Sequence, residues 1–363
     1  MIPSFDTLDS VADAVLKSIP EGLTRGEVAV GLYGLGFLGR WVLPRLKERG
    51  VRLVSCYDAN EALKSTLAEG LPVYVPSQLK TTPPEFLFVA ARHAVKPVSE
   101  MLSDLGVPHV SYDAWHVASD FAAFRHIHDC IMHDYRSKEV LRAVLMTMLT
   151  GEKRYCSAVF EKDQYFCLPR FCGSESEVYV DAGAFVGDSA ERFIWTHNGV
   201  FSQIYAFEPG PRQFAALKVR TGRLMEEWAL VPASIKLINA GLGETDCSVA
   251  AGSDNGQLTN LTIHNDSAAT GIAVDIVSLD SFLRGNRITF LKADVEGMEM
   301  ALLKGAQFTI QHNKPKISIC VYHYPTDIPE ITNYLASLVP DYQFALRHHS
   351  PQLMETVLYC WAD

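Results

Sequence analysis

Short apolar runs alternate with helical patterns through the first third of the chain. Helical spacing of apolar positions marks residues 41–49 and 95–105, and strand-like runs lie at 27–33, 52–57, 73–75, 86–90 and 109–112. Strands that alternate with helices are typical of βαβ units, whose strands run parallel. We therefore predict a Rossmann-like α/β domain over residues 1–118.

The next segment, residues 119–172, lacks this alternation. Its apolar positions follow helical spacing in 121–131 and 140–149, and Gly151 is a suitable C-terminal stop. We expect a helical segment that joins two domains, packs across one end of the second sheet and contributes to a lid.

The alternation returns in residues 173–363, which we expect to form a second α/β domain. Strands are predicted near 178–182, 203–208, 235–240, 287–293 and 316–322. The last two apolar runs, 342–347 and 356–361, are joined by a loop too short for a parallel crossover, so they should be antiparallel. Residues 247–277 suggest an inserted β-hairpin. The expected fold is therefore two Rossmann-like domains, the second a sheet that ends in an antiparallel strand.

Length and charge restrict the class of protein. A chain of 363 residues with 48% hydrophobic and 20% charged residues fits two domains with separate cores. A formal net charge of −10 disfavours a nucleic-acid groove. The N-terminus lacks the pattern of a signal peptide, and no apolar run has the length of a membrane span, so we expect a cytoplasmic protein. The eight cysteines contain no Cys-x-x-Cys pair and are expected to be reduced structural thiols.

The first glycine motif is Gly34-x-Gly36-x-x-Gly39, which follows a predicted strand and opens a helix. Asp58 ends the next strand about 20 residues later, as in dinucleotide-binding units. The motif predicts a second nucleotide site, for NAD or a nucleotide-sugar. The domain has only about half the size of a full dinucleotide fold, and no hydride-transfer partner is evident. It resembles small nucleotide-sugar-binding domains, and a purely structural scaffold is the alternative.

The second glycine turn is Asp181-Ala-Gly-Ala-Phe-Val-Gly187. Gly183 and Gly187 leave bare backbone where a strand turns into a helix, which suits a bound ligand. Asp181 could accept from an ammonium or hydroxyl group. Glu208, which ends the following strand, is placed to accept from both hydroxyls of a ribose.

Two further motifs make a family resemblance specific. Residues 291–306 contain Asp-Val-Glu-Gly, and Tyr-His follows the next strand at 322–323. Together with the glycine turn and Phe-Glu-Pro at 207–209, the chain from about Gln164 onward resembles FkbM-type methyltransferases that depend on S-adenosylmethionine (SAM). The resemblance implies that residues of the turn, Asp181, Gly183, Phe185 and Gly187, surround the methionine part of SAM, that Glu208 and Pro209 hold the ribose, and that Gly241 lies at the adenine edge.

The remaining polar strand ends supply candidate catalytic residues. Asp294, Glu296 and His323 are expected at the same sheet edge, with neutral His323 as the base for an acceptor hydroxyl. The same three residues could instead hold a divalent cation, a possibility we do not favour because an adjacent acidic pair is missing. The predicted function is O-methylation of a sugar, glycan precursor or secondary metabolite. The alternative is an NAD-dependent sugar oxidoreductase or nucleotide-sugar sensor. Partners would be the small-molecule or glycan acceptor and, in a homo-oligomer, a second copy.

Overall fold

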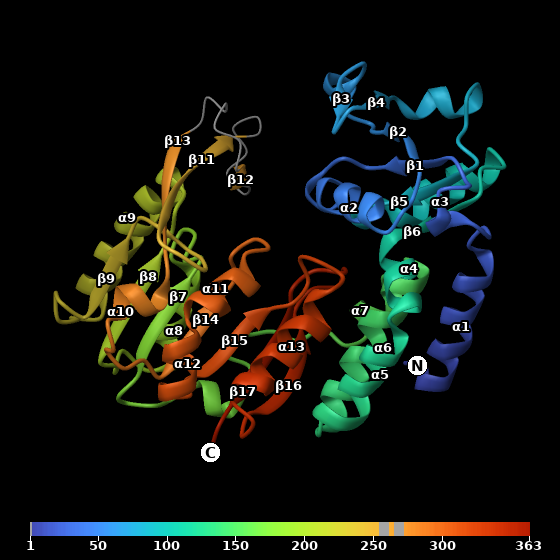
Figure 1. Ribbon diagram of the computed structural model, residues 1–363. Helices are drawn as coiled ribbons and strands as arrows, with labels where there is room; N and C mark the ends of the chain where they lie inside the picture. Colours follow the sequence, from blue (N-terminus) through green and yellow to red (C-terminus); the bar gives the residue numbers. More distant parts are fainter. Residues whose placement is uncertain (1, 254–260, 265–271) are drawn as a thin grey trace. The chain divides into compact units, whose positions relative to one another are not determined.

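The computed structural model describes residues 2–253, 261–264 and 272–363. Within these ranges it describes only the backbone of residues 250–253, 261–264 and 272. The chain divides into two compact units (Figure 1). The first unit comprises Met1–Phe160, Tyr324–Thr326 and Ser350–Met354, and the second comprises Glu161–His323, Asp327–His349 and Glu355–Asp363.

The first unit contains a six-stranded sheet with the order β3-β4-β2-β1-β5-β6. β1 pairs in parallel with β2 and with β5, so the strand order reverses beside β1, where ligands bind in open α/β sheets. Helix α2 buries Leu38, Val42 and Leu46 at helical spacing in the same core as β1. The α-helices and strands of this unit are α1 (Phe5–Ser18), β1 (Val30–Tyr33), α2 (Phe37–Glu48), β2 (Leu53–Tyr57), β3 (Leu67–Ala68), β4 (Leu71–Tyr74), β5 (Phe86–Val89), α3 (Val95–Asp104), β6 (His109–Ser111), α4 (Tyr112–Ser119), α5 (Phe121–His126), α6 (Tyr135–Thr150) and α7 (Arg154–Ser157).

The helical segment packs on the N-terminal helix. Helices α4 and α6 pack against α1, and α7 packs against α6. These helices belong to the first unit, whose main segment ends at Phe160. The reason lies in α6, whose apolar side chains are buried from Val140 through Leu149 and need a partner that the N-terminal helix α1 supplies.

The second unit contains a seven-stranded sheet with the order β16-β17-β15-β14-β7-β8-β9. β17 is antiparallel to both of its neighbours, β15 and β16, whereas the pairs from β15 to β9 are parallel. The reversed strand is therefore present as predicted, and it lies next to the edge strand rather than at the edge. Tyr179 of β7 stacks on Phe193 of α8 with ring centroids 4.2 Å apart, which ties sheet to helix in the core.

The elements of the second unit follow the predicted strands closely. They are β7 (Val178–Ala182), α8 (Asp188–Thr196), β8 (Gln203–Phe207), α9 (Pro211–Glu227), β9 (Ile235–Ile238), β10 (Gly241–Leu242), β11 (Cys247–Ser253), β12 (Leu261–His264), β13 (Ile272–Val277), α10 (Leu279–Leu283), β14 (Phe290–Ala293), α11 (Glu299–Gly305), α12 (Gln307–Asn313), β15 (Lys316–Cys320), α13 (Asp327–Leu338), β16 (Gln343–His348) and β17 (Thr356–Trp361).

The predicted hairpin is part of a small sheet with the order β10-β13-β11-β12. β11 pairs antiparallel with β12 and β13, and β13 pairs in parallel with β10. The predicted turns at 252–256 and 265–267 lie largely or wholly outside the described residues.

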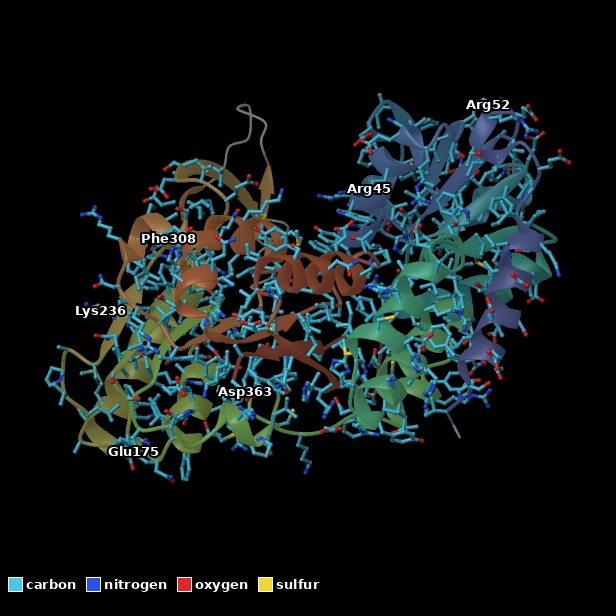
Figure 2. The ribbon with its side chains drawn as sticks, turned by 60° about the horizontal axis from the view of Figure 1, so that its bottom comes forward. Arg45, Arg52, Glu175, Lys236, Phe308 and Asp363 are labelled. Atoms are coloured by element: carbon cyan, nitrogen blue, oxygen red, sulfur yellow. The ribbon has the colours of Figure 1, made fainter. Side chains whose placement is uncertain are left out.

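Charged side chains such as Arg52 in the first unit and Lys236 in the second are exposed at the surface of their units (Figure 2). Among the described residues, we find no helix with the length and apolar character that crossing a membrane requires.

Candidate active site

The glycine turn after β7 depends on residues without side chains. Gly183 has φ +75°, and a Cβ there would lie 1.8 Å from the carbonyl oxygen of Asp294. Gly187 has φ +87° and caps α8 at its N-terminus. Phe185 also has positive φ, +47°, which is strained for a bulky residue, and its side chain is 40% exposed. Such a turn presents backbone N–H groups beside the start of a helix.

Glu208, directly after β8, is held by that turn. Its Oε2 accepts a hydrogen bond of 2.9 Å from the N–H of Phe185, and its Oε1 accepts one of 2.7 Å from the N–H of Gly210. The residue is 6% exposed, and burial raises the pKa of its carboxyl group to about 7 despite the two backbone donors. Two backbone donors thus fix the carboxylate beside the glycine turn.

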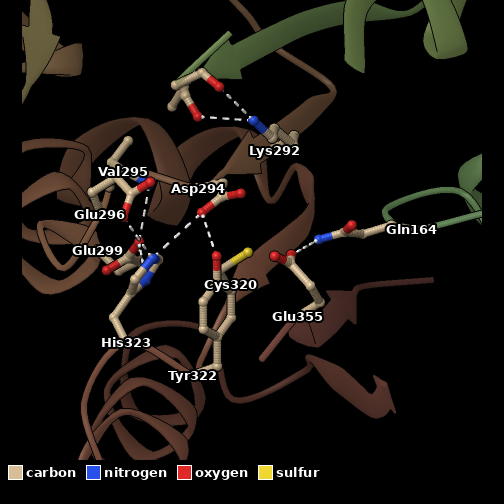
Figure 3. Close-up of polar contacts among 12 residues, drawn as sticks. Gln164, Lys292, Asp294, Val295, Glu296, Glu299, Cys320, Tyr322, His323 and Glu355 are labelled. Carbon is tan, nitrogen blue, oxygen red and sulfur yellow. Dashed lines mark hydrogen bonds and ion pairs between the residues drawn. The ribbon is translucent and has the colours of Figure 1, made fainter. Parts of the chain in front are cut away.

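Beneath the turn lies a buried ion pair that sequence reasoning missed. Lys292 of β14 is 2% exposed, and its Nζ lies 3.1 Å from Oδ1 of Asp181 on β7. The ammonium also donates to the carbonyl oxygen of Gly183 at 2.7 Å (Figure 3). Burial opposes the charged form of Lys292, but the Asp181 and Asp294 carboxylates outweigh it and raise the pKa of Lys292. The sequence signal for this ion pair was a single charged residue, Lys292, within the apolar run at 288–293.

These contacts change the expected part of Asp181. Its side chain is fully buried, its Oδ2 accepts a hydrogen bond of 2.6 Å from Ser189, and its Oδ1 faces Lys292. The carboxylate therefore supports the glycine turn from below in this conformation, rather than presenting an oxygen to a ligand.

The expected residues Asp294, Glu296 and His323 do come together (Figure 3). His323 Nε2 lies 3.7 Å from Oδ1 of Asp294 and 3.5 Å from Oε2 of Glu296. Glu299, in the first turn of α11, completes the group with Oε1 at 3.1 Å from His323 Nδ1. The loop that returns to α11 turns through positive φ at Glu296 (+53°) and Gly297 (+91°). Glu299 lies two residues after the Asp-Val-Glu-Gly motif and was not among the predicted site residues.

The electrostatics of His323 differ from the expected neutral imidazole. The side chain is buried, which favours the neutral form, but the carboxylates of Glu299, Glu296 and Asp294 outweigh burial and raise the pKa of His323 well above its usual value. An imidazolium cannot accept a further proton. In this conformation the carboxylates around it, of which Glu296 is 52% exposed, are the proton acceptors of the group.

Tyr165 connects this group to the segment before β7. Its hydroxyl donates to Oδ2 of Asp294 at 2.7 Å, and its ring lies beside the Lys292 ammonium, 5.0 Å from Nζ to the centroid. These contacts place Tyr165 at the site.

Gly241, which is predicted to lie at the adenine edge, is close to Pro209. Gly241 on β10 is buried, and a Cβ there would lie 3.7 Å from the Cβ of Pro209. Pro209 follows Glu208 directly, so the three residues expected around the nucleoside occupy one corner of the second unit.

The glycine motif of the first unit has closely similar geometry. Gly34 has φ +95°, and a Cβ on Gly39 would lie 1.8 Å from the Gly34 carbonyl oxygen, so the helix packs directly on the turn. A Cβ on Gly36 would meet nothing within 4 Å. Asp58 accepts a 2.6 Å hydrogen bond at Oδ2 from the N–H of Leu35 and a 2.8 Å bond at Oδ1 from the N–H of Asn60.

Comparison with known proteins bears on the second unit. Residues 181–344 match the family model described as the methyltransferase FkbM domain. This match agrees with the family resemblance that the sequence motifs indicate. No curated protein matches the sequence.

Solved structures support the fold. The chain is similar to a methyltransferase FkbM from Methylobacillus flagellatus KT, with a TM-score of 0.61 and 23% identity over 98% of each chain. An rRNA methylase from Streptococcus thermophilus gives a TM-score of 0.33 with 13% identity over 58% of this chain and 93% of the other. UDP-D-quinovosamine 4-dehydrogenase from Vibrio fischeri gives 0.21 with 20% identity over 23% of this chain and 76% of the other. The first similarity supports the α/β fold of the chain, and the other two scores are too low to carry an argument.

Proposed function

We propose that the second unit transfers a methyl group from SAM to a hydroxyl on a sugar, glycan precursor or secondary metabolite. The observation that carries this proposal is the order of the polar groups along one sheet edge. Strands β8, β7, β14 and β15 are consecutive neighbours in the sheet. Glu208 follows β8 and the glycine turn follows β7. Asp294 follows β14 and His323 follows β15. The FkbM match supports SAM as the methyl donor.

SAM carries its own leaving group, so the protein must mainly align the acceptor oxygen, methyl carbon and sulfur. In our proposal Glu208 accepts hydrogen bonds from the ribose hydroxyls, and Gly183, Phe185 and Gly187 surround the methionine part. Asp181 and Lys292 hold the turn. Asp294, Glu296 and His323 orient the acceptor hydroxyl, and the carboxylates of Asp294 and Glu296 receive its proton. The C–O bond forms as the C–S bond breaks, and the sulfonium becomes a neutral thioether.

The test combines binding and turnover. Calorimetry should show that SAM and its demethylated product bind, and product formation should be followed with a panel of sugar and glycan acceptors. Replacing His323 with Ala should lower turnover by about 10²–10⁴-fold while SAM affinity stays nearly intact. A protein that binds neither SAM nor its product would contradict the proposal.

We further infer a nucleotide site in the first unit at Gly34, Gly36, Gly39 and Asp58. The specific observation is that Asp58 accepts from the glycine turn and from its own loop in the same pattern as Glu208. Thermal-shift measurements with NAD, NADP and common nucleotide-sugars test it, because a ligand at about 100 times its dissociation constant stabilises a protein by about 2.7 kcal/mol. A response to NAD with cofactor reduction by a sugar would favour the oxidoreductase alternative. No response would leave the unit as a scaffold.

A further inference from the structure

Three potential metal ligands converge at the end of β14. Single ligand atoms of Asp294, Glu299 and His323 all lie within 4.8 Å of one another. The residues come from three separate places: the loop after β14, the first turn of α11 and the segment after β15 (Figure 3). Two carboxylates and one imidazole form a donor set that suits Mg²⁺ or Mn²⁺.

Glu299 supplies the observation that points to a ligand. It is 1% exposed, and its Oε1 accepts a 3.0 Å hydrogen bond from the N–H of Val295. Its Oε2 is also buried, yet it has no hydrogen-bond donor among the described residues. A buried carboxylate oxygen without a donor is energetically costly, because nothing replaces the water that it loses on burial. A bound cation would satisfy this oxygen.

Hydrogen bonds from neighbouring groups hold the carboxylates of Asp294 and Glu299 in place, as the outer hydrogen-bond partners of metal ligands do. Tyr165 donates to Oδ2 of Asp294, which leaves Oδ1 on the side of His323. The N–H of Val295 fixes Glu299 in the same way. Glu296, whose side chain is 52% exposed, lies 3.5 Å from His323 and gives the group a solvent-facing side through which a hydrated ion could enter.

We propose that Asp294, Glu299 and His323 bind one divalent cation, Mg²⁺ or Mn²⁺, and that the acceptor hydroxyl takes one of its open positions. His323 releases its proton to solvent when the cation binds, because only the neutral imidazole is a ligand. The cation lowers the pKa of that hydroxyl, its proton passes to Glu296 or to water, and the resulting alkoxide attacks the methyl group of SAM. This inference deepens the proposed function and revises the preference for a metal-free site, because the third ligand is Glu299 rather than Glu296.

The test is direct metal binding by the full chain. Protein treated with EDTA and dialysed should bind one Mn²⁺ per chain, measured as loss of the free Mn²⁺ signal in electron paramagnetic resonance. Glu299→Gln should weaken binding at least about tenfold. Glu330→Gln changes an exposed carboxylate of α13 in the same way and should bind Mn²⁺ like the wild type. Asp294→Asn provides a second ligand variant should Glu299→Gln not fold.

The outcomes separate the two proposals. Absence of stoichiometric Mn²⁺ binding, or equal affinity in folded wild-type and ligand variants, would overturn the metal site. SAM calorimetry on the same EDTA-treated protein reports on the proposed function, because the cofactor residues lie on other strands. SAM binding without Mn²⁺ binding would leave the methyltransferase proposal standing alone. Mn²⁺ binding without SAM binding would support the metal site and contradict the proposed methyl transfer.

Discussion

The two glycine turns of this chain share one hydrogen-bonding design but differ in what surrounds them. In the first unit Asp58 accepts from Leu35 in the turn, and in the second Glu208 accepts from Phe185. In both units the second oxygen of the carboxylate accepts an N–H two residues further on. Two different sequences thus produce the same local arrangement, in which an acidic residue after a strand accepts a hydrogen bond from the backbone of a glycine turn.

The surroundings differ at the neighbouring strand. β14 of the second unit carries buried Lys292 and is followed by the Asp294 group, whereas β5 of the first unit is followed by Ala90 and Ala91. Arg92, next along, pairs bidentately with Asp113. The two units therefore share the glycine turn and its acidic residue, but only the second unit has buried Lys292 and the Asp294 group on the neighbouring strand.

The largest effect is expected when the second turn loses its support. Lys292→Met removes the cation that faces buried Asp181, and breaking a buried pair typically costs about 3–5 kcal/mol. The free energy of unfolding, measured in urea, should fall by that amount, and SAM affinity should fall with it. The control is Lys47→Met in the first unit, whose pair with Glu69 is 39% and 45% exposed and should matter by less than about 1 kcal/mol. Similar losses in both variants would contradict the buried-pair argument.

The next effect separates the two acids. Glu208→Ala should weaken SAM binding by about 1.5–3 kcal/mol, the scale of charge-assisted hydrogen bonds. Asp58→Ala should leave SAM affinity unchanged and abolish any thermal shift caused by a nucleotide. Calorimetry gives the SAM affinity of both variants, and thermal denaturation gives the nucleotide-induced shift of both. Unchanged SAM affinity in the Glu208 variant would move the ribose contact elsewhere.

Within the first turn, two glycines should respond differently to the same methyl group. Gly39→Ala places a Cβ against the Gly34 carbonyl and should lower stability by about 1–3 kcal/mol. Gly36→Ala meets open space and should cost no more than about 1 kcal/mol as a helix N-cap. If the site binds nucleotides, the Gly36 variant should nevertheless lose the ligand-induced thermal shift. Retention of that shift would argue that no ligand approaches the backbone there.

The sequence predicted the elements that depend on local patterns. Strand β7, both glycine turns and the acids that follow them are local signals, and the structure contains each of them near its predicted position. The convergence of Asp294 and His323 followed from the rule that parallel strands end at one edge. The FkbM resemblance rested on short motifs, and residues 181–344 match the family model of the methyltransferase FkbM domain.

What the sequence did not predict depends on three-dimensional neighbours. In the sequence, Lys292 is a single charge within an apolar strand, and only the fold shows that it pairs with Asp181. The protonation of His323 depends on Glu299, which reaches the imidazole only because Glu296 and Gly297 reverse the backbone. The helices after residue 118 gave no sequence signal for their partner, α1, about 100 residues earlier along the chain.

The smallest expected effect is a pH dependence that belongs to the second turn. Burial raises the pKa of Glu208 to about 7, so the carboxyl group of the free protein gains a proton as the pH falls through that value. Ribose hydroxyls bind the ionised form better, because protonation removes an acceptor. SAM affinity should therefore be constant above pH 7 and fall below it, by at most about tenfold or 1.4 kcal/mol per pH unit.

The matched variant is Glu208→Gln, which keeps the shape of the side chain and removes its titration. Its SAM affinity, measured by calorimetry from pH 5.5 to 8.5, should be weaker and should lack the change near pH 7. The sign for folding is opposite: a carboxyl whose pKa is higher in the folded protein favours the folded state when protonated, so its contribution to stability decreases as pH rises from the unfolded value, 4.5, to about 7. An equal pH slope in wild type and variant would assign the titration to another group and remove Glu208 from the ribose site.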